Sequence, residues 1–370
     1  MLVQMAVVLL VGSFLLSAFL TVLAKRFAAR VGLVAHPKAD RYHRSIIPLG
    51  GGVAIFLTLA AFLIGAAAAV RFLVVPGHLA GLTGRIGLDP ADFLRRSDEL
   101  LIILLCAAIL FVVGLRDDKR ALGPFVKLAV QFAVAALAAF FADVRIEFFI
   151  ESRIVTAALS AFWIVLIVNA FNFLDNMDGA SAGIAVIASS VLLTAAAFNG
   201  QILVGGLALI FIGALLGFLV FNFPPASIFM GDAGSLVVGF FVALLTLRTT
   251  YYQQAGSGPW YPVMLPLIAM AVPLYDFTSV TLLRISQGKS PFVGDTQHFS
   301  HRLRRRGLTD RQTALTLYLA TLCTGLGATF LYQVNLIGAV LIAVQTILIV
   351  AIIGIFESTG RNGGPKAEGQ

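Results

Sequence analysis

Long apolar runs recur along the whole chain, and they constrain its fold more than any other feature. Hydrophobic residues make up 59% of the 370 residues, and charged residues only 12%. A helix needs roughly 20 apolar residues to cross about 30 Å of hydrocarbon. Backbone polar groups inside lipid must be satisfied within their own segment, which makes each run a helix. The sequence therefore predicts an all-α, polytopic integral membrane protein.

Eleven membrane-spanning helices are expected, with ten as the lower number. We predict them at residues 3–23, 51–74, 99–115, 124–142, 154–172, 180–198, 201–221, 234–250, 262–282, 313–332 and 335–355. The remaining tail, residues 356–370, is polar and rich in glycine, so we predict that it is disordered.

Basic residues concentrate in one set of loops, and this bias predicts the orientation. The first set of loops carries Lys25, Arg26, Arg30, Lys38, Arg41, Arg44, Arg116, Lys119, Arg120, Arg284, Lys289, Arg302, Arg304, Arg305, Arg306 and Arg311. The opposite loops carry fewer basic residues, which acidic residues dilute. The positive-inside rule assigns the first set to the cytoplasm. We therefore expect a multi-pass protein of the inner (plasma) membrane with its N-terminus outside and its C-terminus cytoplasmic.

Three other classes of protein fit the sequence poorly. The pI of 9.8 follows from the membrane topology, and no basic module interleaved with aromatic residues indicates a nucleic-acid partner. Cys106 and Cys323 lie in separate predicted spans, which disfavours a disulfide or a thiolate metal site. An internal repeat, which is typical of many transporters, is not visible.

Six aspartates at the edges of, or inside, the apolar runs are the strongest indication of function. They are Asp117, Asp118, Asp175, Asp178, Asp232 and Asp276. A carboxylate at membrane depth costs roughly 2.5–3.5 kcal/mol on insertion scales, so it is normally retained for a function. The predicted topology places all six toward the cytoplasmic side. This arrangement indicates an active site.

The segment GLRDDKRALGPFVKLAVQ joins two acids to a lysine and a glutamine. Pro124 begins the fourth predicted span, so Lys127 and Gln131 share one face near its start. A lysine at a helix end can simply snorkel to the interface. Beside Asp117 and Asp118, however, it can also bind a phosphate, while the paired acids hold Mg²⁺ or handle a proton.

The segment VNAFNFLDNMDGASAG repeats polar residues on one helix face. Asn169, Asn172 and Asp175 recur every three residues, and Asp178 follows. Oxygen-bearing side chains at this density favour a hard cation or the polar edge of a nucleotide base. An Asx-type turn at a polar helix end would explain only one asparagine and one aspartate.

Three further loops carry candidate binding residues. In HPKADRYHRSIIPLGGG, basic residues including His43 precede three glycines, which fits either a phosphate-binding loop or close helix packing. In FNFPPASIFMGDAGS, glycines at 231 and 234 flank Asp232. In DTQHFSHRLRRRGLTDRQTAL, His298, His301 and Arg302 favour contact with an oxyanion.

The end of that last loop has a simpler explanation. Residues 304–306, all arginine, are expected to anchor the chain against anionic membrane lipid. Gly307 is expected to end a short helix, and Thr309 with Gln312 to form a capping box that starts the tenth span.

Taken in order, these motifs resemble the polyprenyl-phosphate N-acetylhexosamine-1-phosphate transferase family. The matching stretches also include PLYDFTSVTLLR, and together they run from about residue 36 to 303. The resemblance implies Mg²⁺-dependent transfer of a sugar 1-phosphate from a UDP-N-acetylhexosamine to polyprenyl (undecaprenyl) phosphate, with release of UMP; Mn²⁺ is a possible substitute. It also implies that residues 1–355 form one transmembrane catalytic domain, with cytoplasmic active-site loops at 24–50, 116–123, 173–179, 222–233 and 283–312.

The resemblance implies a role for each candidate residue. The Mg²⁺ ligands would be Asp232 and Asn172. Catalytic roles would belong to Asp117, Asp118, Asp175, Asp178, Lys127 and His301. Substrate contacts would come from Asn169, Asn222, Phe229, His298, Arg302, His43 and Gln131. Among these, Asp117 would engage the polyprenyl phosphate, and Asn222 and Phe229 would lie near uracil.

The chain departs from the family pattern at Asn176, Ala180 and Ser300, where the family often has glycine, leucine and histidine. A triple histidine, the signature of the branch that uses UDP-MurNAc-pentapeptide, is also absent. We therefore favour the branch that starts envelope polysaccharides, commonly with UDP-GlcNAc. The alternatives are phospho-N-acetylmuramoyl-pentapeptide transfer and, from another class, a cation-coupled transporter. A homodimer is compatible with the sequence.

Overall fold

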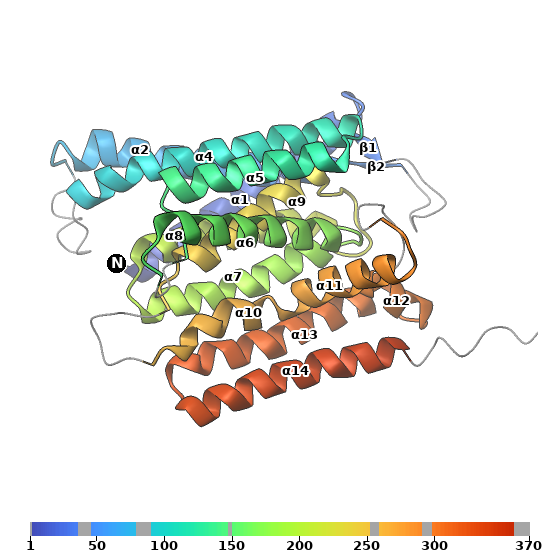
Figure 1. Ribbon diagram of the computed structural model, residues 1–370. Coiled ribbons are helices and arrows are strands. Elements are labelled where there is room, and N and C mark those ends of the chain that lie inside the picture. Colours follow the sequence, from blue (N-terminus) through green and yellow to red (C-terminus); the bar gives the residue numbers. More distant parts are fainter. Residues whose placement is uncertain are drawn as a thin grey trace, which may run out of the picture.

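The computed structural model describes residues 2–35, 46–78, 90–146, 150–251, 259–290 and 298–358, and His43 lies outside these ranges. Long helices run side by side in a bundle (Figure 1). The N-terminal half contributes α1 (Leu2–Ala28), α2 (Gly51–Ala69) with the π-helical turn η1 (Val70–Val74), α4 (Pro90–Lys119), α5 (Pro124–Phe141), α6 (Arg153–Leu174) and α7 (Ala180–Phe198).

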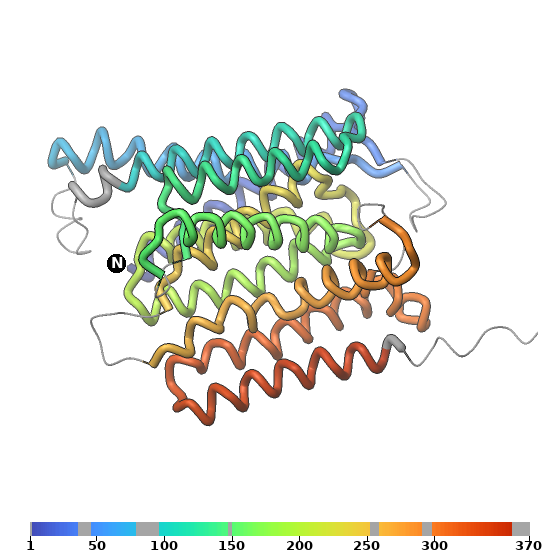
Figure 2. Tube along the Cα trace, in the orientation of Figure 1, coloured from blue at the N-terminus to red at the C-terminus, as the bar shows by residue number. Residues whose placement is uncertain are grey.

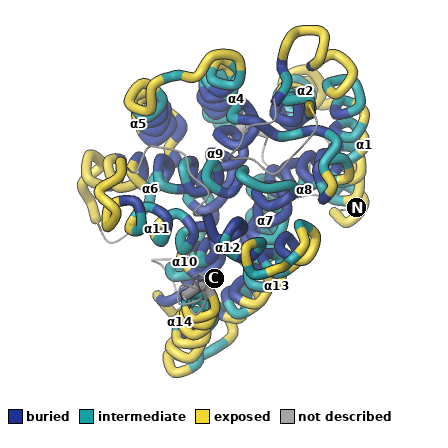
Figure 3. Tube along the Cα trace, turned by 90° about the vertical axis from the view of Figure 1, so that its right-hand side faces the viewer, coloured by how far each residue is buried: buried dark blue, intermediate teal, exposed yellow. Residues whose placement is uncertain are grey.

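The C-terminal half completes the bundle. It comprises α8 (Ile202–Asn222), α9 (Asp232–Arg248), the 3₁₀ turn η2 (Tyr261–Met264), α10 (Leu265–Ala269), α11 (Ala271–Ser286), α12 (Phe299–Arg305), α13 (Asp310–Thr329), the 3₁₀ turn η3 (Phe330–Tyr332) and α14 (Leu336–Ser358). Two short strands, β1 (Val34–Ala35) and β2 (Ile47–Pro48), pair antiparallel. The helices α2, α4 and α5 lie at one edge of the bundle and α14 at the opposite edge (Figures 1 and 3).

The predicted all-α membrane fold is confirmed. Nine helices in the described ranges are long and apolar enough to span a membrane, and a tenth span arises if the bent pair of 261–269 and 271–286 is counted as one. The predicted eighth span is α9, which has 17 residues. The 61° bend of the pair has a local cause, because Pro273 has no N–H for the Ala269 carbonyl and its ring clashes with that carbonyl.

Helix α9 forms the centre of the bundle, and other helices surround it (Figure 3). Every residue from Ala233 to Thr246 is buried, which explains why the helix is apolar on all sides. At Gly52 of α2, an added Cβ would lie 2.2 Å from the Gly234 nitrogen. Glycine at this crossing therefore allows the backbones of α2 and α9 to touch.

The polar helix ends meet at one end of the bundle. The C-terminal ends of α4 and α6 and the N-terminal ends of α5 and α9 lie there, together with α12 (Figure 2). The strand pair β1–β2 lies at the same end, and β2 contacts the segment before α9 through a hydrogen bond from the Phe229 nitrogen to the Pro48 oxygen, 2.9 Å. Segments far apart in sequence are thus brought to one face of the membrane domain.

Two local predictions in the C-terminal region are confirmed. Gly307 follows α12 with φ of 93°, a conformation that favours glycine. The side chain of Thr309 accepts from the Gln312 nitrogen, and the Gln312 side chain accepts from the Thr309 nitrogen, which makes a complete capping box for α13. Both cysteines are free.

Candidate active site

A lysine ammonium bridges two aspartates at the polar end of the bundle. The Nζ atom of Lys127 lies 3.0 Å from Asp117 Oδ2 and 3.0 Å from Asp232 Oδ2. Asp117 lies near the end of α4, Lys127 in the first turn of α5 and Asp232 at the first position of α9. Pro124 begins α5 and so sets how far Lys127 lies from the helix end. Two of the predicted acids and the predicted phosphate-binding lysine therefore form one cluster.

Asp118 turns away from this cluster and binds the start of α9. Its two carboxylate oxygens accept hydrogen bonds from the backbone nitrogens of Asp232, at 2.8 Å, and Ala233, at 3.1 Å. These N–H groups have no partner inside the helix, and the helix dipole favours a negative charge at this end. Gly231 has φ of 72° and leaves only 2.7 Å between an added Cβ and Asp118 Oδ2. Asp118 therefore fixes the position of Asp232.

One amide side chain contacts the cluster, and two others pair with each other on the same two helices. The Nδ2 atom of Asn172 lies 3.2 Å from Asp232 Oδ1 and 2.8 Å from Ser235 Oγ. One turn away on the same helix, Asn169 donates a hydrogen bond to Gln131 Oε1. The predicted helix faces of α5 and α6 thus face one another. Asp232 is held through one oxygen by Lys127 and through the other by Asn172.

The cluster has the chemistry of a hard-cation site with few protein ligands. In the described part of the chain, no three His, Cys, Asp or Glu side chains converge on one point. Mg²⁺ usually takes one or two carboxylates and completes its shell with water and substrate phosphates. Asp117 and Asp232 already share one positive group, the Lys127 ammonium, so they fit this pattern. Asn172 directs its NH₂ group at Asp232, and its role as a ligand stays a prediction.

The residues predicted near the nucleotide tie two loops together. Asn222, only 4% exposed, accepts from the Gly179 nitrogen at 3.0 Å and donates to the Ile228 oxygen at 2.9 Å. Asp178 Oδ2 accepts from the Ala226 nitrogen at 2.8 Å. Asp175 ends α6 as its C-terminal cap. These bonds fix the loop after α6 against the loop after α8, beside the Lys127 cluster.

A buried ionic network joins α11 to α12. Asp276, Arg284 and His298 are 1%, 2% and 6% exposed. Asp276 Oδ1 accepts from the Phe299 nitrogen at 2.6 Å, and its Oδ2 lies 3.1 Å from His298 Nδ1. His298 Nε2 lies 3.4 Å from Arg284 Nη2. Arginine only donates, so Nε2 accepts and Nδ1 carries the proton toward Asp276.

The sequence did not predict this network, because its members come from separate segments of the chain. The position of Asp276 inside a predicted span was the available signal, but nothing in the sequence paired it with His298. Arg284 also lies over the Phe173 ring, with 5.0 Å from Cζ to the ring centroid, which adds a cation–π contact. The network fixes where α12 begins and thereby positions the residues that follow His298.

Helix α12 contacts both neighbouring segments through polar bonds. Arg302 Nη2 lies 2.8 Å from Ser279 Oγ on α11. Ser300 donates to Asn176 Oδ1 in the loop after α6. Asn176 and Ser300 are two of the three departures from the family pattern, and they contact each other directly.

The histidine His301 is buried on α12 and neutral at pH 7. Burial, together with the neighbouring His298 ring and the positive charge of Arg304, lowers the pKa of His301 to about 4. As a neutral imidazole it can accept or donate a hydrogen bond to a phosphate or sugar, but it contributes no positive charge.

The pKa of His301 predicts how stability depends on pH. Between pH 6.5 and 4, the unfolded chain binds a proton at this position that the folded chain excludes, so stability falls as the pH falls through this window. The full difference is on the order of 3 kcal/mol. We expect the melting temperature of the native protein to fall more between pH 7 and pH 4.5 than that of His301→Gln. Equal pH dependence in the two proteins would contradict the buried, neutral imidazole.

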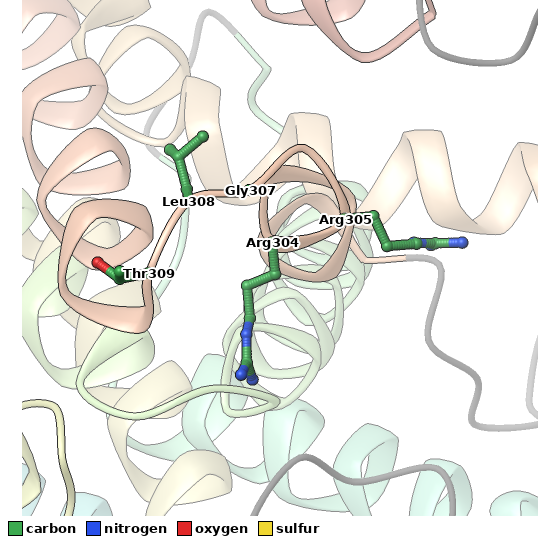
Figure 4. A pocket seen from close by; sticks show the side chains of 5 residues that line it. All are labelled: Arg304, Arg305, Gly307, Leu308 and Thr309. Atoms are coloured by element: carbon green, nitrogen blue, oxygen red, sulfur yellow. The ribbon is translucent and has the colours of Figure 1, made fainter. Parts of the chain in front are cut away.

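A shallow cavity of about 340 Å³ beside α12 is lined by Arg304, Arg305, Gly307, Leu308 and Thr309 (Figure 4). The two arginines leave the helix in different directions. Arg304 pairs with Asp310 at the start of α13, Nε to Oδ1 2.7 Å, and both side chains are partly exposed. None of the residues of the Lys127 cluster lines this cavity.

We expect Arg304→Ala to change turnover by less than about threefold. The Arg304–Asp310 pair is partly exposed, and such pairs contribute about 0–1 kcal/mol. Turnover per folded protein in detergent measures this. A loss of more than tenfold would place Arg304 in the reaction centre instead of at the membrane surface.

Comparison with known proteins identifies the family of this chain. The model of "Glycosyl transferase family 4" matches residues 100–250. A protein of Bacillus subtilis (strain 168), named "Probable undecaprenyl-phosphate N-acetylglucosaminyl 1-phosphate transferase", is 32% identical over 321 residues, 85% of this chain and 81% of its own. The chain belongs to glycosyl transferase family 4. The segment of the chain that the family model matches contains Asp117, Lys127 and Asp232.

Two further relatives are similar to this family 4 protein over most of its length. The undecaprenyl-phosphate alpha-N-acetylglucosaminyl 1-phosphate transferase of Salmonella typhi is 28% identical over 337 residues, 88% of this chain and 83% of its own. The decaprenyl-phosphate N-acetylglucosaminephosphotransferase of Mycobacterium tuberculosis (strain CDC 1551 / Oshkosh) is 27% identical over 333 residues, 82% and 77%. The family resemblance drawn from the motifs is confirmed.

Proposed function

We propose that this membrane-embedded phosphotransferase moves GlcNAc 1-phosphate from UDP-GlcNAc to polyprenyl phosphate, releasing UMP and leaving a lipid-linked pyrophosphoryl sugar. The observation that carries the proposal is the Lys127 ammonium between Asp117 and Asp232 at one end of the bundle. Relatives from three bacteria are named for transfer of N-acetylglucosamine phosphate to prenyl phosphates. Undecaprenyl phosphate is the first acceptor to test, because the Bacillus and Salmonella names specify it.

The reaction joins an anionic phosphate to an anionic diphosphate, so charge neutralisation and positioning dominate. Lys127 supplies a fixed positive charge within reach of both substrates' phosphates. Bound Mg²⁺ would supply further neutralisation of the pyrophosphate and of the charge that develops on UMP. The residues that would hold it are Asp232 and Asp117, with Asn172 as an additional donor.

Asp117 is the residue that we assign to the acceptor. Its Oδ2 binds Lys127, and its Oδ1 accepts from the Leu122 nitrogen at 2.5 Å. The loop between α4 and α5 therefore fixes its carboxylate beside Lys127. The acceptor phosphate is already an anion, so Asp117 orients it, or removes its last proton, without acting as a strong base.

The placement of the acids supports an enzyme over a transporter. Transport acids are expected near the bilayer midplane, reachable in turn from both sides. Asp117 and Asp118 lie in the last turn of α4, and Asp232 is the first residue of α9. We place this end in the cytoplasm of an inner-membrane protein, because the basic loops flank it. Assembly as a homodimer stays a prediction.

The proposal is tested by UMP release from purified protein in detergent with undecaprenyl phosphate and Mg²⁺. UDP-GlcNAc, UDP-GalNAc and UDP-MurNAc-pentapeptide are offered separately. We expect release that depends on lipid, requires UDP-GlcNAc and stops with EDTA. Release with UDP-MurNAc-pentapeptide alone would establish the lipid I reaction instead. Protein that neither binds a UDP-sugar nor releases UMP would refute the transferase assignment.

A further inference from the structure

A cavity of about 480 Å³ opens at the end of the bundle opposite the Lys127 cluster. Glu99, which lines it, precedes Asp117 by 18 residues in α4, a separation of roughly 27 Å along the helix axis. The cavity is therefore a separate site from the reaction centre. Its volume lies in the range of small-molecule binding sites.

Charged side chains surround one part of this cavity. Three arginines and two carboxylates line it: Arg96, Arg145, Arg248, Glu99 and Asp143. Arg248 Nη2 lies 2.6 Å from Glu99 Oε2, and its Nη1 lies 3.3 Å from the Ala142 oxygen. Arg145 binds Asp143 through Nε and Nη2. Each of these two guanidinium groups has five N–H donors and uses two of them in these bonds.

Another part of the cavity wall is apolar and reaches into the membrane domain. It includes Trp163, Val204, Leu247, Val263 and Leu267. Trp163 lies ten residues after Arg153 in α6, about 15 Å along the helix from its start. Its Nε1 donates to Thr246 Oγ1 at 2.8 Å, so the ring is held in place with its polar edge satisfied.

Polar bonds keep the floor of the cavity fixed. Gln201, between α7 and α8, accepts from the Thr250 nitrogen at 2.8 Å and donates to Thr250 Oγ1 at 2.9 Å. It also donates to the Arg248 oxygen at 3.2 Å. The backbone that carries Arg248 is thus tied to a neighbouring helix pair, and the cavity is formed before any ligand arrives.

We propose that this cavity binds the phosphodiester headgroup of a membrane phospholipid. The N–H donors of Arg145 and Arg248 that these bonds leave over suit one phosphate, which arginine binds through paired N–H donors. The apolar wall suits the glycerol ester region and the first methylenes of the acyl chains. The site lies at the ends of membrane-spanning helices, where lipid headgroups and aromatic side chains meet.

Trp163 provides a direct reporter, since the chain has two tryptophans and Trp260→Phe leaves Trp163 alone. We would measure its fluorescence in phosphate-free dodecyl maltoside micelles during addition of phosphatidylglycerol brominated near the top of its chains. We expect saturable quenching at low mole fraction. Diacylglycerol with the same brominated chains has no phosphate, and we expect it to quench only in proportion to its bulk concentration.

Variants separate the headgroup from the chains. In the Trp260→Phe background, Arg145→Gln should raise the phospholipid fraction at half-quenching by about tenfold, as loss of a charge-assisted hydrogen bond does. Arg248→Gln combined with Glu99→Gln removes a whole pair without leaving a lone charge and should act similarly. Arg153→Gln is the matched control, because Arg153 lies at the same end, donates to the Phe140 oxygen and does not line the cavity.

Equal quenching by phosphatidylglycerol and diacylglycerol would overturn the proposal, as would unchanged half-quenching in both cavity variants. Soluble glycerol 3-phosphate carries the phosphate without the acyl chains. Added at the concentration at which the brominated lipid saturates the quenching, it should not restore the Trp163 fluorescence. Relief by this compound would overturn the assignment of the apolar wall to lipid chains.

Discussion

Asp232→Asn is expected to lower UMP release by on the order of 10³-fold or more, the largest effect of any single substitution here. The change removes the charge that pairs with Lys127 at 3.0 Å and that would hold Mg²⁺, and removing one group that stabilises a developing charge typically costs 10²–10³ in rate. Asparagine keeps the shape of the side chain and can still bond to Asn172. The melting temperature should therefore change little, and size-exclusion behaviour in detergent should match that of the native protein.

The matched control for this experiment is Asp310→Asn, the same chemical change at the partly exposed pair with Arg304. Its UMP release should stay within about threefold of the native value, because such pairs contribute little. Turnover by Asp232→Asn at more than a tenth of the native rate would remove Asp232 from the metal and phosphate site.

Lys127→Met is expected to lower kcat/KM by about 10²-fold or more while tightening the binding of a divalent cation. Methionine keeps an unbranched side chain only one atom shorter but leaves Asp117 and Asp232 facing each other without a positive group. A divalent cation then has no ammonium to displace, and two adjacent carboxylates favour it more strongly. Catalysis still falls, because the fixed positive charge for the substrate phosphates is gone. Mn²⁺ binding followed by electron paramagnetic resonance, with UMP release on the same sample, measures both effects.

Lys119→Met serves as the control. Lys119 is an exposed lysine at the end of α4, the helix that carries Asp117, and we expect it to contribute only to the membrane–water interface. It should bind Mn²⁺ and release UMP like the native protein. If Lys127→Met bound the metal more weakly than the native protein does, the ammonium would be supporting the metal site and not competing with it. Activity within threefold of native would exclude Lys127 from phosphate binding.

Local signals in the sequence account for the helices and for the set of acids, but not for their contacts. Each of the eleven predicted runs is helical, because membrane insertion depends on each segment's own composition, but the ninth is bent by 61° and the eighth, α9, is shorter than a full span. The spacing of Lys127 and Gln131 correctly gave one face of α5. The meeting of Asp117 with Asp232, however, depends on how α4 packs on α9, and no periodicity in either helix contains that information.

Adjacent residues with the same chemistry were also indistinguishable in sequence. Asp117 and Asp118 both end α4, yet one faces Lys127 and the other binds the backbone of α9. The difference arises from the direction in which the last helical turn presents each side chain. His298 is a similar case, because its partner Asp276 belongs to another helix. Such roles follow only when the packing of the elements is known.

The length of α9 has a consequence for how two unlike substrates meet. Its 17 residues span about 26 Å, less than the roughly 30 Å of bilayer hydrocarbon. The helices that surround it in Figure 3 are all longer by their bounds, so the lipid does not have to thin around the short helix. A helix of this length need not reach both membrane surfaces, so we expect Asp232, its first residue, to lie below the surface on its side of the membrane. At that depth a water-soluble nucleotide would arrive from the aqueous side, and a lipid phosphate would reach the same residue without leaving its leaflet.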